Sequence, residues 1–312
     1  MLLHIGRVLR FGSLLSLSLL AAGWSVPAQA QVTLERKYVE GTKQVVHTTM
    51  KLKQVATIAG SNQDTENDRF IISSIEVLKP DAEGNTVVAH KTDKLSATFK
   101  LPGGTTLIFD SDDANRKADN PALEPLLDLL RAAAKLRSTT VHDKSGKVIR
   151  IEGLDKAAEG LPDALKSEFD AERIKKVANQ ELESLPSKPV KKGDTWSTNT
   201  ELGLGGGQLM KFSTEYKYVG EVQEGGKTLH KIESKTLTVT YTLENNPNVR
   251  VSKSELSPKE SGSVMLFDAN AGQVHSVKGK VQIVGAFELD AGGMALPGKL
   301  DLTIESEIVR QP

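Results

Sequence analysis

Met210–Tyr218, with the sequence MKFSTEYKY, decides the fold class of this chain. Its apolar and aromatic side chains alternate with lysine, serine and glutamate, and a period of two places one face of a β-strand on a core and the other in water. Half-buried antiparallel strands have this pattern, so the sequence predicts a β-dominated fold. The same alternation recurs at Thr236–Leu243, Val46–Leu52, Val281–Leu289 and Leu300–Ile308.

Turn signals separate these runs and predict a chain of hairpins. Each signal supplies a glycine where a hairpin needs a positive φ. The signals are Asp81–Gly84, Asp143–Gly146, Glu224–Gly226 and Asn270–Gly272.

Helices are expected only in the middle of the chain. Asn120 as N-cap and Pro121 at the first helical position precede a leucine-rich stripe, which predicts a helix over 121–136. A second helical region is expected over 162–182, broken near Asp170. Residues 138–153 between them should form a hairpin. We therefore expect an α+β fold dominated by long antiparallel strands, in one or two curved, half-barrel-like sheets whose open face or end the helices cover.

The two ends of the chain share a weak internal similarity. At a constant offset of 142, Phe70–Leu101 aligns with Phe212–Leu243 without gaps, and the turn glycines Gly84 and Gly226 coincide. Two explanations remain open. Either 31–160 and 190–312 are related half-units joined by the helical segment, or two ordinary hairpins converged on one pattern.

The first thirty residues resemble a secretory signal peptide. Arg7 and Arg10 precede an apolar run from Phe11 to Trp24, and Ala28–Ala30 is an A-x-A cleavage site. The sequence predicts cleavage after Ala30, so that 31–312 form a single β-rich exported domain, either periplasmic or secreted. No later run holds eighteen consecutive apolar residues, so no transmembrane anchor is expected in the mature protein.

Composition excludes several classes of function. Without Arg7 and Arg10 the chain carries 38 basic and 40 acidic residues, a balance that argues against nucleic acid as a partner. The absence of cysteine excludes disulfides, thiolate metal sites, a cysteine nucleophile and a lipidated N-terminal cysteine.

No motif in the chain predicts catalysis, a metal site or a cofactor. The histidines beyond residue 30 (His47, His90, His142, His230 and His275) form no ligand pair at helical spacing and are interpreted as surface residues. No G-x-S-x-G elbow is present. Asp110–Asn115 resembles the opening of a calcium loop but lacks its glycine and its final glutamate, and is interpreted as a solvated acidic turn. The glycine-rich run Gly203–Gly207 has no Walker lysine and is interpreted as a flexible linker.

Leu185–Trp196, with the sequence LPSKPVKKGDTW, is the one stretch with the character of a motif. Its prolines favour an extended approach, Gly193-Asp194 a turn, and Trp196 a large ring on the core. The stretch resembles the L-P-x-x-P-V-x-x-G-D-T-W segment of uncharacterised exported bacterial proteins, a domain family without assigned function. Ile108–Ser111 is similar to a strand end in the same proteins. The resemblance implies a curved antiparallel β architecture with an inserted helical segment, and implies no chemistry.

These observations favour a non-enzymatic function, and three hypotheses follow in order. The first is a binding or carrier protein for a lipid, another apolar ligand or an envelope component, with Leu126, Leu127, Leu130 and Trp196 as ligand-contacting or lid residues. The second is a structural or protein-interaction module of the cell envelope. The third is a hydrolase.

Overall fold

The computed structural model describes residues 31–205, 207–243 and 248–311. Gln31–Pro312 form one compact unit. The predicted signal peptide, 1–30, lies outside the described residues. Among those described, no helix is both long and apolar enough to cross a membrane.

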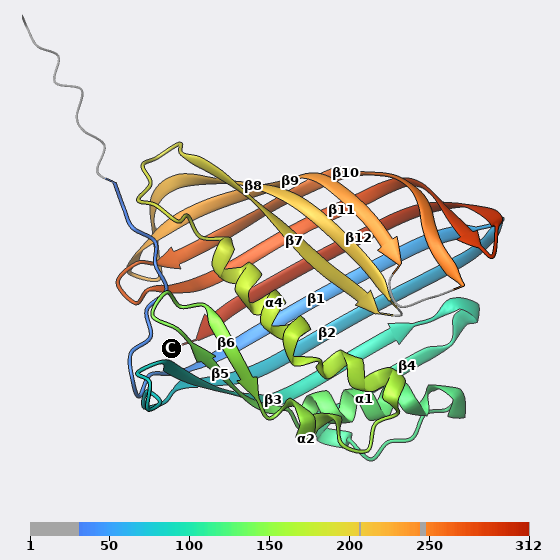
Figure 1. Cartoon of the computed structure of the whole chain (residues 1–312), viewed down its shortest axis with the longest axis horizontal. Coiled ribbons are helices and arrows are strands. Elements are labelled where there is room, and N and C mark those ends of the chain that lie inside the picture. Colours follow the sequence, from blue (N-terminus) through green and yellow to red (C-terminus); the bar gives the residue numbers. More distant parts are fainter. Residues whose placement is uncertain (1–30, 206, 244–247, 312) are drawn as a thin grey trace, which may run out of the picture. The chain divides into compact units, whose positions relative to one another are not determined.

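Twelve antiparallel strands form a single sheet, as the alternating patterns predicted. Nine of these strands have 11 to 20 residues each, and the other three have five or six (Figure 1). The strands are β1 (Lys43–Ile58), β2 (Ser61–Val77), β3 (Thr86–Lys100), β4 (Thr106–Asp110), β5 (Arg137–His142), β6 (Val148–Glu152), β7 (Thr195–Gly205), β8 (Gln208–Glu224), β9 (Lys227–Leu243), β10 (Val249–Asp268), β11 (Gln273–Ala291) and β12 (Met294–Gln311).

The sheet is curved but unclosed. Its order is β6-β5-β3-β2-β1-β12-β11-β10-β9-β8-β7, and β4 pairs with the far half of β3. The strands β1 and β12 lie side by side in the middle of the sheet. Strands β2 to β6 lie on one side of this pair, and β7 to β11 lie on the other. In the described part of the chain the edge strands β6 and β7 do not pair with each other.

The helices lie where the sequence placed them. A 3₁₀ turn at Pro121–Leu123, capped by Asn120, leads into α1 (Glu124–Ala134). The second region comprises α3 (Asp163–Lys166), a 3₁₀ turn and α4 (Ala171–Glu183), and it breaks at Asp170, whose side chain caps α4. The short helix α2 (Leu154–Ala158) was not predicted.

Helix α4 lies in the opening between the two edges of the sheet (Figure 1). It contacts both β6 and β7. Helix α1 instead covers the β3–β4 end, where Leu127 and Leu130 pack with Leu95, Phe99 and Phe109.

Three local interpretations were wrong. Gly203–Gly205 end strand β7, so this run is part of the β7–β8 hairpin rather than a linker; Gly206 lies outside the described residues. Leu237 is 44 % exposed because a register shift between Ser213 and Thr214 leaves it unpaired in β9. His142 and His230 are each only 7 % exposed, so they are not surface residues.

The two aligned hairpins are β2–β3 and β8–β9, and their turn glycines have nearly equal φ angles, +79° for Gly84 and +77° for Gly226. Their side chains are not equivalent throughout, since Leu95 is 3 % exposed and its counterpart Leu237 is 44 % exposed. The duplication therefore stays a prediction.

Candidate functional site

A row of partly accessible residues can be followed from strand to strand across the inner face of the curved sheet. Register places Trp196 beside Tyr216, and the row continues through Ser234, Ser263, Gly279, Ser306 and Met50 to Arg69. All eight residues, which we call the inner row, are half-buried. The row crosses the sheet from β7 to β2.

Buried apolar clusters flank the inner row on both sides. One contains Phe212, Ile283 and Ile304. The other contains Tyr218, Ile232 and Met265. Leu34 and Leu185, which belong to segments outside the strands, pack in the same cluster. The concave face is thus closed at these two places, and the inner row lies between them.

The residues at the centre of the inner row, Ser234, Ser263 and Gly279, are all small. A Cβ on Gly279 would lie 2.7 Å from the Cβ of Ser263, so the site has no room for a larger side chain. The hydroxyls of Ser234 and Ser263 hydrogen-bond to each other at 2.6 Å, which pairs one of their two O–H donors.

Two adjacent carboxamides fasten α4 to the edges of the sheet. Asn179 accepts a hydrogen bond from the Val148 N–H at 2.8 Å and donates one to the Val148 carbonyl at 3.1 Å, as a neighbouring strand would. Gln180 accepts one from the Glu201 N–H at 3.1 Å, and Lys176 pairs with the Glu201 carboxylate at 2.5 Å. The helix thereby occupies backbone groups of both β6 and β7, which an open sheet leaves unpaired.

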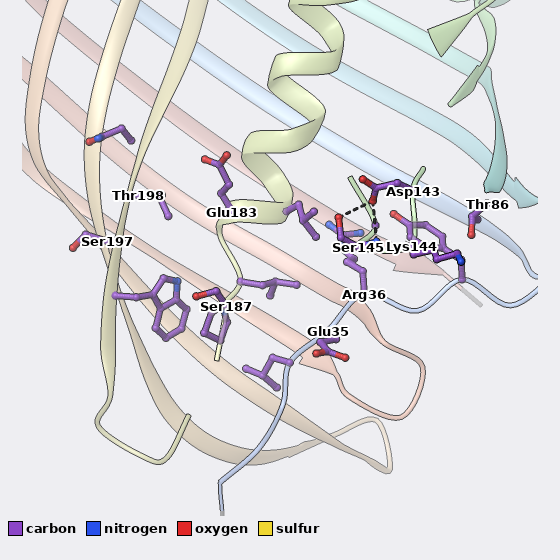
Figure 2. Close-up of a pocket in the computed structure, with 18 of the residues that line it drawn as sticks. Glu35, Arg36, Thr86, Asp143, Lys144, Ser145, Glu183, Ser187, Ser197 and Thr198 are labelled. Carbon is purple, nitrogen blue, oxygen red and sulfur yellow. Dashed lines mark hydrogen bonds between the residues drawn. The ribbon is translucent and has the colours of Figure 1, made fainter. Parts of the chain in front are cut away.

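A cleft of about 1030 Å³ opens beside the C-terminal end of α4 (Figure 2). Its walls come from the N-terminal segment 34–38, the β5–β6 turn, the segment after α4, and β7. Leu34, Leu182, Leu185 and Trp196 give it apolar surface. Trp196 therefore belongs both to the wall of the cleft and to the inner row.

Trp196 is held by its neighbours on the cleft wall. Its indole N–H donates to the Ser184 carbonyl at 3.2 Å, and its ring stacks on Tyr216 with centroids 5.7 Å apart. The ring is half-buried. It therefore combines the structural role that the sequence favoured with a surface that a ligand could reach.

The other predicted ligand-contacting residues lie elsewhere. Leu127 and Leu130 are 1 % and 5 % exposed in the cluster on β3 and β4, and Leu126 is partly buried against it. They do not line the cleft. Their part in ligand binding stays a prediction, while the element that bridges the edges of the sheet is α4 rather than α1.

A buried hydrogen-bonded chain lies behind the cleft. Tyr38 Oη is 3.2 Å from His142 Nδ1, and Thr140 Oγ1 lies 2.8 Å from His142 Nε2 and 2.9 Å from His90 Nε2. Burial lowers the pKa of His90 to about 4, and burial also lowers the pKa of His142. Both imidazoles are therefore neutral at pH 7.

This hydrogen-bonded array of Tyr38, His142, Thr140 and His90 presents no accessible nucleophile. A threonine between two histidines could suggest an activated nucleophile, but Thr140 is only 8 % exposed and does not line the cleft. No cluster of metal-ligating side chains occurs in the described ranges.

Two arginines, Arg36 on the cleft wall and Arg310 on strand β12, influence each other electrostatically. Arg36 lines the cleft and extends toward the β5–β6 turn (Figure 2). Arg310 belongs to the inner face of β12 opposite Val46, and its guanidinium donates to the Val274 carbonyl at 3.0 Å and to Gln44. Burial, together with the positive charge of Arg36, lowers the pKa of Arg310 to about 10. It remains a cation at neutral pH.

Sequence reasoning missed Arg36, Arg310, Asn179 and Gln180. Arg36 precedes β1 and Arg310 lies on β12, so no local sequence pattern relates the two arginines. The carboxamides lie on a charged helix that looks solvent-exposed from its sequence alone. In both cases the missing information was the order of the strands.

Comparison with solved structures finds only distant similarity. A structure of lipovitellin, concerned with lipid–protein interactions, has a TM-score of 0.41 and 8 % identity over 88 % of this chain, which spans 26 % of the lipovitellin chain. A Bacteroides fragilis protein with a YmcC-like fold, provisionally described as exported, has a TM-score of 0.21 and 10 % identity over 87 % of this chain and 98 % of its own. An outer membrane channel of Pseudomonas putida F1 has a TM-score of 0.25 and 6 % identity, covering 91 % of this chain and 100 % of the channel. All three TM-scores lie below 0.5, so no property of these proteins transfers to this chain.

Sequence comparison gives a clearer result. No curated protein is detectably similar to the chain. A family model with the description "Family of unknown function (DUF6263)" matches residues 83–248, a range that contains the Leu185–Trp196 segment. Because this range covers more than half of the 312 residues, the chain belongs to the family of unknown function DUF6263.

Proposed function

We propose that this protein is a non-enzymatic binding or carrier protein that holds an amphipathic ligand on the inner face of its sheet. One observation carries the proposal: the inner row stays half-exposed although it lies at the centre of the concave face, between two buried apolar clusters. Interiors of folded proteins are normally filled to high density. A continuous accessible row in such a place is a binding surface by default.

The dimensions of this surface suit an extended ligand. Neighbouring strands lie roughly 4.8 Å apart, so the six steps from β7 to β1 span roughly 29 Å along the sheet. The flanking side chains Leu52, Val277 and Val281 are apolar and partly buried. The cleft beside Trp196 supplies the entrance, and α4 lies beside it.

The location that fits this function is the periplasm or the outside of the cell. The argument for it rests on the pattern of residues 1–30, a positive region, an apolar run and an A-x-A boundary. A carrier of an apolar molecule has an evident use there, because such molecules cannot cross an aqueous compartment unaided.

The chain offers a direct test because it contains no cysteine. Met50→Cys places a thiol in the inner row, whereas Thr49→Cys places one on the outer face of the same strand, and both positions are half-exposed. We expect a thiol-reactive maleimide to label both variants of delipidated protein. A saturating neutral apolar probe, N-phenyl-1-naphthylamine, should slow labelling at residue 50 by about tenfold or more and leave residue 49 within about twofold.

The control separates occupancy from general tightening of the fold. Equal protection at both positions would indicate tightening, and protection at neither would show that the inner face does not bind the probe. Either result would refute the proposal.

A further inference from the structure

The sheet is not paired continuously between its neighbouring strands β9 and β10. Register pairing between these two strands covers only His230–Ser234 and Ser263–Phe267. Each strand is paired along almost its whole length with its other neighbour, β9 with β8 and β10 with β11. In the described part of the chain, residues 235–243 of β9 and 250–262 of β10 are therefore not in register pairing with each other. We call this break in the ladder the seam.

Serine hydroxyls join the two strands across the seam. The Ser261 hydroxyl accepts a hydrogen bond from the Thr236 N–H at 3.1 Å and donates one to the Thr236 carbonyl at 3.2 Å. The Ser254 hydroxyl lies 3.3 Å from the Tyr241 backbone nitrogen, from which it accepts a hydrogen bond. Serine side chains offer backbone groups an alternative to a sheet ladder. The seam is thus closed by contacts of single side chains where the rest of the sheet has paired backbones.

Irregularities on both strands explain why the ladder stops here. In β9, a register shift against β8 leaves Leu237 unpaired, and in β10 a second shift against β11 falls between Pro258 and Glu260. Both lie within three residues of the contact between Thr236 and Ser261. A bulge disrupts the ladder and bends its strand. Proline has no N–H to donate and is confined to edge strands and bulges, so β10 behaves as an edge strand here although it lies inside the sheet.

The seam adjoins the candidate binding surface. It begins directly beyond Ser234 and Ser263, which belong to the inner row. Val239 and Leu256, one from each side of the seam, are buried in the same apolar cluster beside the inner row. Parting the two strands would expose these side chains to water, which is unfavourable unless another apolar surface covers them.

We propose that β9 and β10 part at the seam when the apolar part of the ligand moves along the inner row. This inference rests on the proposed function and adds how a closed concave face accommodates its ligand. Proteins open locally where few contacts must break, and the seam is such a place because it lacks a backbone ladder. An apolar ligand in contact with Val239 and Leu256 offsets the cost of exposing them, whereas a polar solute does not.

A removable bridge across the seam tests this inference, because the chain contains no cysteine. Thr236→Cys/Ser261→Cys places a thiol on each side of the seam, and ethane-1,2-diyl bismethanethiosulfonate joins them by a short link that dithiothreitol removes. Glu233→Cys/Val264→Cys is the matched control, since these residues face each other on the same two strands inside the paired ladder. Capping the seam thiols with methyl methanethiosulfonate adds bulk without a bridge. The intact mass confirms each modification.

The readout is the association rate of N-phenyl-1-naphthylamine with delipidated protein, measured by stopped-flow fluorescence. We expect the seam bridge to slow association by about tenfold or more, because binding that needs a conformational change becomes slow when the change is blocked. The control bridge and the capped protein should stay within about twofold of the wild type, and dithiothreitol should restore the rate. Ser261→Ala removes one closing contact and should accelerate association by about twofold to tenfold, whereas Ser257→Ala, at an exposed position of the same strand, should not.

The outcomes separate this inference from the proposed function. If the wild type binds the probe and the seam bridge leaves the rate unchanged, the seam does not part and the binding function stands. The same conclusion follows if both bridges, or the bridge and the cap, slow association alike. If the wild type binds no probe, the proposed function fails and this inference fails with it. Should the double variant not fold, the comparison of Ser261→Ala with Ser257→Ala decides, and equal rates would refute the inference.

Discussion

Asn179→Ala tests how firmly α4 is attached to the sheet. The substitution removes two hydrogen bonds, at 2.8 and 3.1 Å, between the carboxamide and the backbone of Val148. Val148 is only 4 % exposed, so water does not readily replace the lost partners. Leaving a buried backbone group unpaired costs about 1–3 kcal/mol.

We therefore expect Asn179→Ala to lower the free energy of unfolding by about 2 kcal/mol, which in a domain of this size reduces Tm by about 4–8 °C. Urea denaturation gives the free energy, and amide hydrogen exchange shows where the change occurs. Exchange at Val148 should accelerate more than exchange at Ile283, which is fully buried in the centre of the sheet.

The matched control is Asn115→Ala, which removes the same side chain from an exposed loop position. It should change the free energy of unfolding by less than about 0.5 kcal/mol. If Asn179→Ala is as mild as the control and exchange at Val148 is unchanged, α4 does not fasten the edge of the sheet and the reasoning fails.

Three further predictions concern pH, Trp196 and the strand glycines. Because the pKa of folded His90 is about 4 against 6.5 in the unfolded chain, the unfolded state binds more protons between these values, and stability should fall by up to about 3 kcal/mol as pH drops from 6.5 to 4; urea titrations of wild type and His90→Gln should show a smaller fall in the variant. Trp196→Ala should lower the free energy of unfolding by about 2–4 kcal/mol, near the lower end of the range for a fully buried tryptophan because the ring is half-buried. Trp196→Phe keeps a stacking ring and should lower it by about 1 kcal/mol less. A change in Tm below one degree for Trp196→Ala would contradict this prediction. Gly285→Ala should destabilise by more than about 2 kcal/mol because φ is +150° and a Cβ would overlap the Glu255 carbonyl, while Gly262→Ala, with open space around it, should change stability by less than about 1 kcal/mol; equal thermal shifts would refute the strain argument.

Local sequence patterns predicted the elements well because local physics determines them. Alternation at Met210–Tyr218 indicated β8, where Met210 and Tyr218 are buried. Asn120 was sufficient to locate one cap, since a cap depends on one side chain and the next three residues, and the predicted break near Asp170 lies at the residue that caps α4.

Features that depend on strand order could not be predicted in this way. The pairing of β1 with β12 joins strands that are far apart in the sequence, and no local signal encodes it. The bulge that exposes Leu237 depends on the register of β8, not on the alternation within β9. Histidines looked solvent-exposed because a lone polar residue in a strand usually faces water, whereas His142 is buried with Thr140 and Tyr38 as partners.

The most direct test of the central claim is the mass of the protein as it exists in its own cell. Native mass spectrometry of protein purified from that cell without detergent should give a complex heavier than the polypeptide, and organic extraction should release an amphipathic molecule. A native mass equal to that of the polypeptide alone would contradict the account.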